Sequence, residues 1–322
     1  MSAATETGEP VAAPAVTLAA PRPFYWSVRR ELWEHRSLYI APLVAAAIMI
    51  AAVLLNVGAI PEGLGSLGDL DPAHRNAAAF GFYSGFSTLI VFTMILVAAF
   101  YSLDALHAER RDRSILFWKS MPVSDLTTVL AKLFTATVVA PAIAFVVIIL
   151  AQLLVLLIAT ATVLAAGVDL ALLWGNAQFL QAAILALYAL MVLSLWFAPL
   201  YAWLLLVSSW AKRALFLWAV LPPLAIALFE RMAFGTSYFM DMLRYRLQGG
   251  LASAFVERSW RGGMVAGERG AELKLDGNFP DHLLQSLTPV EFLSNPWLWA
   301  GLAVAAALVG AAVWMRRYRE PL

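Results

Sequence analysis

Cysteine is absent from the 322 residues, and charged residues make up only 13% of them. Without cysteine the chain can form no disulfide and has no thiolate to serve as a nucleophile or metal ligand. Soluble domains carry about 25% charged residues, so the low charge argues against an ordinary soluble fold. Hydrophobic residues reach 62% instead. The composition therefore predicts a protein that crosses a membrane several times.

Motifs for catalysis and nucleotide binding are also missing. The string closest to a phosphate-binding loop, GGMVAGER, has Glu268 where such a loop needs lysine, so no ATP site of that kind is expected. The four histidines are scattered, and none has a metal ligand three or four residues further on. We therefore expect a chain that is not an enzyme by itself and that holds no metal or cofactor.

Six apolar segments are long enough for membrane helices, which need about 20 residues each. They are Leu38–Ile60, Phe80–Leu103, Leu130–Ala166, Gln178–Ser208, Ala214–Phe229 and Trp297–Trp314. The third exceeds the thickness of a bilayer, but we treat it as one helix. Splitting it would place Lys212–Arg213 and the C-terminal arginines outside the cell, against the positive-inside rule. With six spans, both termini are predicted to be cytoplasmic.

We take the apolar cores of these segments to be free of acidic, basic and histidine side chains, which argues against a proton-coupled transporter. Asp104 and Glu230 lie at segment ends, where interfacial or ion-paired roles are expected. The polar residues inside the segments are the uncharged Asn56, Gln152 and Gln181. Either they form hydrogen bonds between helices, or they line a translocation path.

Before the first span, residues 24–37 are predicted to form an amphipathic helix at the cytoplasmic interface. An apolar face recurs at helical spacing, while Arg29, Arg30 and Glu34 point elsewhere. The helix serves either as a simple membrane anchor or as a docking surface for a partner. Residues 1–23 and 317–322 are expected to be cytoplasmic tails, the first of them disordered, and 38–316 forms the transmembrane domain.

The long external segment 231–296 is predicted to be partly helical. Apolar residues recur every four positions from Phe239 to Phe255, with Gly249–Gly250 interrupting the stripe. Thr288 followed by Pro289 indicates a capped helix start, and a second start signal precedes the last span. The chain as a whole is thus predicted to be an all-α polytopic membrane protein with six transmembrane helices.

The cytoplasmic loop 104–127 combines charged and aromatic residues. Its stretch Glu109–Lys119 has no glycine or proline and is predicted to be a short helix, which Met121-Pro122 would end. Ser124 or Asp125 is expected to cap the following helix. On physical grounds the short helix is either a tryptophan-anchored interfacial helix or a docking element.

This loop resembles the one between spans two and three of membrane subunits of ATP-binding-cassette exporters, the type-2 permease family. The pattern there is an acidic and a basic residue, a small–aliphatic pair, an aromatic stretch, a small-x-Pro-hydrophobic-Ser motif, and a later lysine. The matching residues are Glu109, Arg110, Ser114-Ile115, Phe117-Trp118, Ser120–Ser124 and Lys132, with Tyr101–Asp104 fitting the same subgroup. Arg113-Ser114 departs from the Gly-Thr common in the family. The predicted topology matches as well, so the resemblance covers most of the chain.

The resemblance implies the permease subunit of an exporter in the cell membrane, which moves an amphipathic or hydrophobic substrate outward by alternating access. Separate ATPase subunits would bind ATP and Mg²⁺, and a second permease copy or paralogue would complete the complex. Residues 109–124 would form the coupling helix. The expected ATPase-binding residues are Glu109, Arg110, Arg111, Asp112, Arg113, Phe117, Trp118, Lys119, Met121 and Pro122. Phe117 and Trp118 would be buried anchors, whereas Glu109 could instead brace the loop against the N-terminal arm.

Two other classes of function remain open from the sequence. One is a membrane scaffold or immunity subunit that transports nothing. The other is a lipid-modifying membrane enzyme, for which the available external residues are Asp241, Glu257, Asp281 and His282. Membrane lipid is a further expected partner, and no nucleic acid is expected.

Overall fold

A computed structural model of the chain describes residues 23–68, 72–114, 123–167, 174, 178–255, 265–267, 270–272, 284 and 287–318. Among these residues six helices are long and apolar enough to cross a membrane, and they confirm the six predicted segments. The helices are Ser37–Leu55, Gly81–Arg111, Asp125–Ala165, Phe179–Trp210, Leu215–Phe234 and Pro296–Tyr318. This is the architecture of a multi-pass membrane protein.

The elements follow in chain order and are almost all helical. They are α1 (Pro23–Glu34), α2 (Ser37–Leu55), η1 (Val57–Ala59), α3 (Ile60–Gly68), α4 (Pro72–Arg111), α6 (Asp125–Phe134), η2 (Thr135–Val139), α7 (Ala140–Ala165), α9 (Gln178–Trp210), α10 (Leu215–Phe234), α11 (Tyr238–Ala252), β1 (Val265–Gly267), β2 (Gly270–Glu272), α13 (Pro289–Ser294) and α14 (Pro296–Tyr318). The two short strands pair antiparallel.

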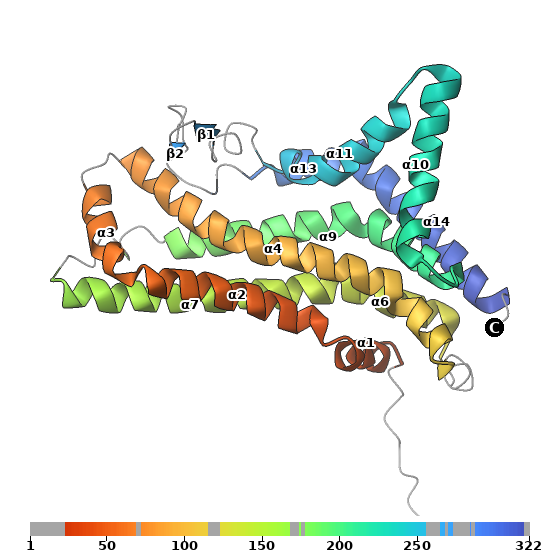
Figure 1. The fold of residues 1–322 in the computed structure, drawn as a ribbon, viewed down its shortest axis with the longest axis horizontal. Helices are drawn as coiled ribbons and strands as arrows, with labels where there is room; N and C mark the ends of the chain where they lie inside the picture. Colours follow the sequence, from red (N-terminus) through yellow and green to blue (C-terminus); the bar gives the residue numbers. More distant parts are fainter. Residues whose placement is uncertain are drawn as a thin grey trace, which may run out of the picture.

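Helices α2, α4, α7 and α9 run side by side along the length of the molecule, and α14 packs against α9 (Figure 1). Their shared core includes the fully buried Phe86, Trp196 and Tyr201. Helix α10 turns away from this bundle and is the least buried of the six spans (Figure 1). We call the end of the bundle where α4 finishes and α6 begins the loop end.

The third span is one continuous helix, as predicted, but it is not uniform. A wider π-helical turn, η2, separates α6 from α7. Pro141 is the second residue after it. Proline cannot donate a backbone hydrogen bond to the carbonyl of Thr137, and its ring crowds that carbonyl. The wider turn relieves this conflict without ending the helix. From the sequence alone, the alternative considered was that this segment is split into two spans. Nothing in the sequence pattern indicated a π turn.

The predicted helix over Glu109–Lys119 is wrong at its N-terminal side. Helix α4 continues through Glu109 to Arg111, so the start of the expected coupling helix belongs to the second span. Arg113 then takes a left-handed backbone conformation with φ of 57°, which breaks the helix. The break was invisible because the stretch contains neither glycine nor proline. Residues 115–122 lie outside the described part of the chain.

The helix predicted at 24–37 is present as α1, and its position at a membrane interface stays a prediction. It packs on α6, where the rings of Phe24 and Phe134 meet edge to face at 5.4 Å.

The proposed tails fall almost wholly on residues 1–22 and 319–322, which are outside the described residues. Ser124 caps α6 as expected, accepting a hydrogen bond from the backbone N–H of Thr127 at 3.0 Å.

The segment 231–296 is partly helical, as predicted, but two details differ. Helix α11 runs through the glycine pair Gly249–Gly250 that interrupts the apolar stripe, and the missing side chain of Gly250 allows close packing. A Cβ on Gly250 would lie 2.8 Å from the Trp196 ring. Thr288 begins α13 without a capping hydrogen bond from its side chain.

Candidate functional site

Charged side chains from four helices meet in the interior of the loop end. They form a connected set that we call the ionic cluster: Arg30 and Glu31 of α1, Glu109 of α4, Asp125 and Lys132 of α6, and Arg316 of α14. Positive and negative side chains are equal in number within it. Burying charges in this way is unfavourable unless each is paired, so the cluster must be kept nearly complete.

Lys132 is the centre of the cluster. Its side chain is 1% exposed, and its Nζ lies 2.8 Å from Glu31 Oε1 and 3.0 Å from Glu109 Oε1. The residue is two positions inside the third predicted span, whose core was expected to be free of charge. That expectation was wrong for Lys132, because two carboxylates from other helices compensate its charge.

Glu31 carries three partners on its carboxylate. Oε1 accepts from Lys132 and, at 2.7 Å, from Arg30, while Oε2 accepts from the Tyr101 hydroxyl at 2.9 Å. Burial raises the pKa of this carboxyl, but the attraction of Lys132 and Arg30 outweighs burial and leaves the pKa below its ordinary value. Glu31 therefore stays ionised and ties α1 to α4 and α6.

Arg316 joins the two ends of the loop. Its Nη1 donates to Glu109 Oε2 at 2.6 Å, and its Nε donates to Asp125 Oδ1 at 2.8 Å. Glu109 lies two residues before the end of α4, and Asp125 is the first residue of α6. One guanidinium on α14 thus fixes both ends of the α4–α6 loop with charge-assisted hydrogen bonds.

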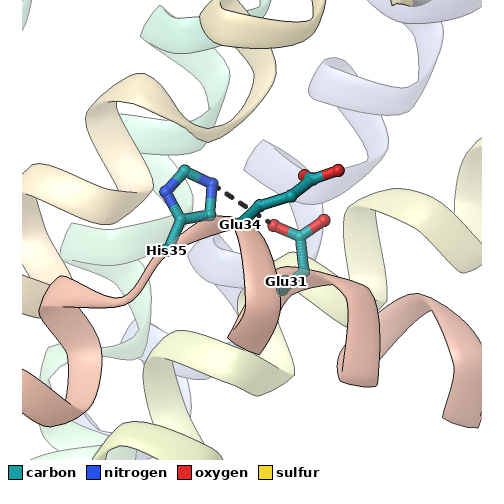
Figure 2. Close-up of side chains that lie close together, drawn as sticks. All are labelled: Glu31, Glu34 and His35. Atoms are coloured by element: carbon teal, nitrogen blue, oxygen red, sulfur yellow. Dashed lines mark ion pairs between the residues drawn. The ribbon is translucent and has the colours of Figure 1, made fainter.

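Beside the cluster, Glu31, Glu34 and His35 bring ligand-type atoms within 4.8 Å of one another (Figure 2). His35 Nε2 lies 3.7 Å from Glu31 Oε2. The Glu31 oxygens are already engaged by Lys132, Arg30 and Tyr101. Because the Glu31 carboxylate is neutralised by its neighbours in the ionic cluster, we do not assign the trio as a cation site. The residues that follow each histidine do not reveal this grouping, because Glu31 precedes His35 in the chain.

Acid should weaken the packing of α1 through His35. Burial lowers the pKa of its imidazole below the ordinary 6.5, although Glu31 opposes the shift. The unfolded chain therefore takes up this proton first, and stability present above pH 6.5 is lost as the pH falls below it. The melting temperature of the purified protein should drop between pH 7 and pH 5.5. The His35→Gln variant should show a shallower drop, and equal slopes would contradict this assignment.

The expected ATPase-binding residues divide into four groups, of which Arg110 alone forms one. Glu109 is 5% exposed and paired with Arg30 at 2.7 Å, so it braces the N-terminal arm, the second of the two roles considered for it. Arg111, Asp112 and Arg113 are exposed, and Arg111 pairs with Asp112 at 3.1 Å. Five of the residues lie outside the described part of the chain: Phe117, Trp118, Lys119, Met121 and Pro122.

Arg110 points inward to the end of a neighbouring helix. Its Nη2 donates to the carbonyls of Ser208 at 2.6 Å and Ala211 at 2.8 Å, which belong to the C-terminal end of α9. A guanidinium at this place satisfies carbonyls that the helix leaves without partners and suits the negative end of its dipole. Ser208 Oγ in turn accepts from the backbone of Leu106 and His107 at 2.9 Å. The end of α4 is therefore clamped to α9.

The candidate path residues do not come together. Asn56 caps the end of α2 and donates to its own helix at Ala52. Gln152 is buried and donates to Ser87 Oγ at 3.0 Å, which is the interhelical role considered for it. Gln181 is half-buried at the start of α9. Gln152 adjoins a cavity wall through its hydrogen bond to Ser87.

The three residues predicted to face away from the apolar side of α1 have different surroundings. Arg29 is exposed, with its guanidinium 5.2 Å from the Trp26 ring and 4.7 Å from the Trp33 ring. Glu34 is exposed and lies 3.6 Å from Arg30 Nε. Arg30 instead belongs to the buried cluster, where the carboxylates of Glu31 and Glu109 outweigh the effect of burial and raise its pKa.

Glu31 and Arg316 were not predicted as site residues from the sequence. Lys132 was named only as the lysine that matches the family pattern. One signal was available: Glu31 lies beside the apolar face that Val28 and Leu32 form on α1, an unfavourable place for an unpaired acid. For the enzyme alternative, Asp241 is exposed and accepts from Ser237 at 2.8 Å. Glu257, Asp281 and His282 are outside the described residues.

The chain was compared with family models, curated proteins and solved structures. None of them matches it. The geometry of the loop end therefore supplies the structural basis for assigning a function.

Proposed function

We propose that this chain is the membrane subunit of an ATP-binding-cassette exporter in the cell membrane, with the α4–α6 loop as the contact for a separate ATPase subunit. The observation that carries the proposal is the Arg316 bridge between Glu109 and Asp125. A loop held at both ends by one buried guanidinium cannot move without moving the helices on either side. This is the mechanical property that a coupling element needs.

The ionic cluster extends this link beyond the two helices that flank the loop. Lys132 and Glu31 connect the loop end to α1, and Arg316 connects it to α14. The Arg110 contacts connect it to α9. A push on the loop by a closing ATPase dimer would thus reach five helices through short polar contacts. An interfacial anchor needs no such set of buried ion pairs.

The mechanism we propose is alternating access powered from outside this chain. The partner ATPases bind ATP and Mg²⁺ and close on one another, and each moves the loop of one permease subunit. The loop end then tilts as a body, and the spans exchange one set of contacts for another. ATP acts on this chain only through the different contacts that the ATPase makes in its two states.

The direct test is purification of the tagged, full-length protein from its native membrane. A soluble subunit with a phosphate-binding loop should copurify, and Trp118→Ala should reduce its recovery at least tenfold, because buried aromatic anchors dominate such interfaces. Trp299→Ala, a matched change at the far end of α14 where the side chain is exposed, should have no effect. Recovery of the intact protein without any ATPase would refute the proposal and favour a scaffold.

A further inference from the structure

A cavity of about 310 Å³ lies between α4, α9 and α11. Its α4 wall runs from Tyr83 to Ile95, while α4 reaches the loop end only at Arg111, so the cavity is far from the ionic cluster. The volume is at the small end of the range for ligand sites. At roughly 30 Å³ per water-sized group, it accommodates about ten such groups.

The walls carry no charge and differ in polarity. None of the described residues that line the cavity is acidic, basic or histidine, and most are aliphatic or aromatic. The α4 wall carries Tyr83, Ser84, Ser87 and Thr88, and the α11 wall carries one further polar residue, the uncharged Gln248. An ionised ligand would find no counter-charge here, and leaving its charge unpaired would be costly.

The serine and threonine hydroxyl groups on the α4 wall can accept hydrogen bonds but have already used their protons. Thr88 donates to the carbonyl of Ser84 at 2.7 Å, and Ser87 donates to the carbonyl of Tyr83 at 2.8 Å. Ser84 likewise donates to the carbonyl of Gly81 at 3.3 Å. These three hydroxyls therefore present oxygen lone pairs, so this part of the α4 wall favours a ligand that brings its own donor.

Gln152 lies behind this wall and supports the same conclusion. Its Nε2 donates to Ser87 Oγ, which fixes that hydroxyl from the α7 side. Its Oε1 is buried and makes no hydrogen bond to any described residue. Such an acceptor in an apolar interior is costly to leave unpaired, and it adds to the surplus of acceptors around Ser87.

We propose that this cavity binds neutral, single-chain amphipathic molecules whose head group donates a hydrogen bond, such as medium-chain alcohols or primary amides. The chain lies among the aliphatic side chains of α9 and α11, and the donor faces Ser87 on α4. The assignment of these molecules as the substrate class of an exporter rests on the proposed function. Binding itself does not require the ATPase.

The test uses the purified full-length protein in lipid nanodiscs, without ATPase. The probes are decanol with a mid-chain diazirine and, at pH 8, the carboxylic acid of the same chain. After irradiation, labelled positions are mapped by mass spectrometry. The alcohol should label the cavity walls of α4 and α9 at least fivefold more than the ionised acid. Equal labelling by the two probes would overturn the proposal.

Two variants separate the cavity from the lipid-facing surface. Ala186→Phe places a ring in the cavity and should reduce alcohol labelling of the walls at least fivefold. Ala183→Phe, the same change on α9 outside the cavity walls, should leave it unchanged. Ser87→Ala removes an acceptor without filling space and should reduce the preference for the alcohol several-fold. If a bilayer acyl chain occupies the cavity instead, it will exclude both probes to the same extent. The alcohol will then label the walls no more than the acid does.

These outcomes are independent of the proposed function. Selective labelling without a copurifying ATPase would establish the binding site and refute the exporter assignment. A copurifying ATPase without selective labelling would retain the exporter and reject this cavity as its neutral-ligand site.

Discussion

Replacing Lys132 with methionine is expected to destabilise the protein by ~3–5 kcal/mol, the usual effect of removing one partner from a buried ion pair. The change leaves Glu31 and Glu109 in the interior with one cation fewer, although both carboxylates lie within 3.0 Å of the lysine nitrogen. Methionine nearly preserves the volume, so packing contributes little to the loss. Thermal unfolding of the purified protein measures the effect.

Two companion variants show whether charge is the cause. Lys212→Met makes the same substitution at an exposed lysine and should change stability by less than ~0.5 kcal/mol. The double variant Glu31→Gln with Lys132→Met should recover a large part of the loss, because it restores equal numbers of positive and negative groups. A double variant as unstable as the sum of the two single variants would exclude charge balance as the explanation.

Replacing Arg316 with lysine should separate the coupling role of the ionic cluster from its role in stability. Lysine keeps the positive charge, but its single ammonium cannot reproduce the two directed hydrogen bonds to Glu109 and Asp125. Loss of one charge-assisted hydrogen bond, worth ~1.5–3 kcal/mol, would weaken the link between the loop ends by about tenfold or more. Substrate-stimulated ATPase activity of the reconstituted complex should fall by a similar factor.

The neighbouring residue provides the matched control. Arg317 is exposed, with its guanidinium 5.6 Å from the Tyr318 ring, so Arg317→Lys should retain stimulation. Copurification of the ATPase should be unchanged in both variants, because neither lies on the exposed part of the loop. Should Arg316→Lys lose the ATPase altogether, or retain full stimulation, the bridge would have no role in coupling.

The transmembrane segments were predictable because the signal for them is local. A run of about 20 apolar residues forms a helix in a bilayer whatever residues come after it in the chain. The last span could be placed to within a residue at its start, because Asn295-Pro296 is a start signal that needs no tertiary information. Partial helicity in the 231–296 segment could be predicted from the four-residue spacing of its apolar residues.

The buried charges were not predictable in the same way. Lys132 and Glu31 are 101 positions apart, and Arg316 and Glu109 are 207 apart, so no spacing in the sequence relates them. Read locally, Glu109 and Arg110 were surface residues of a docking helix. The extension of α4 by two turns beyond its apolar segment rotates Glu109 into the interior, where its partners from three other helices lie.

The sequence by itself therefore determined that this protein crosses the membrane, how many times, and where a charged loop with an aromatic stretch joins two of its spans. Only the tertiary structure decided which charged residues are exposed on that loop and which hold its base. The physical reason is that burial of a charge depends on compensation by other charges. That compensation is set by the packing of helices that are distant in the chain.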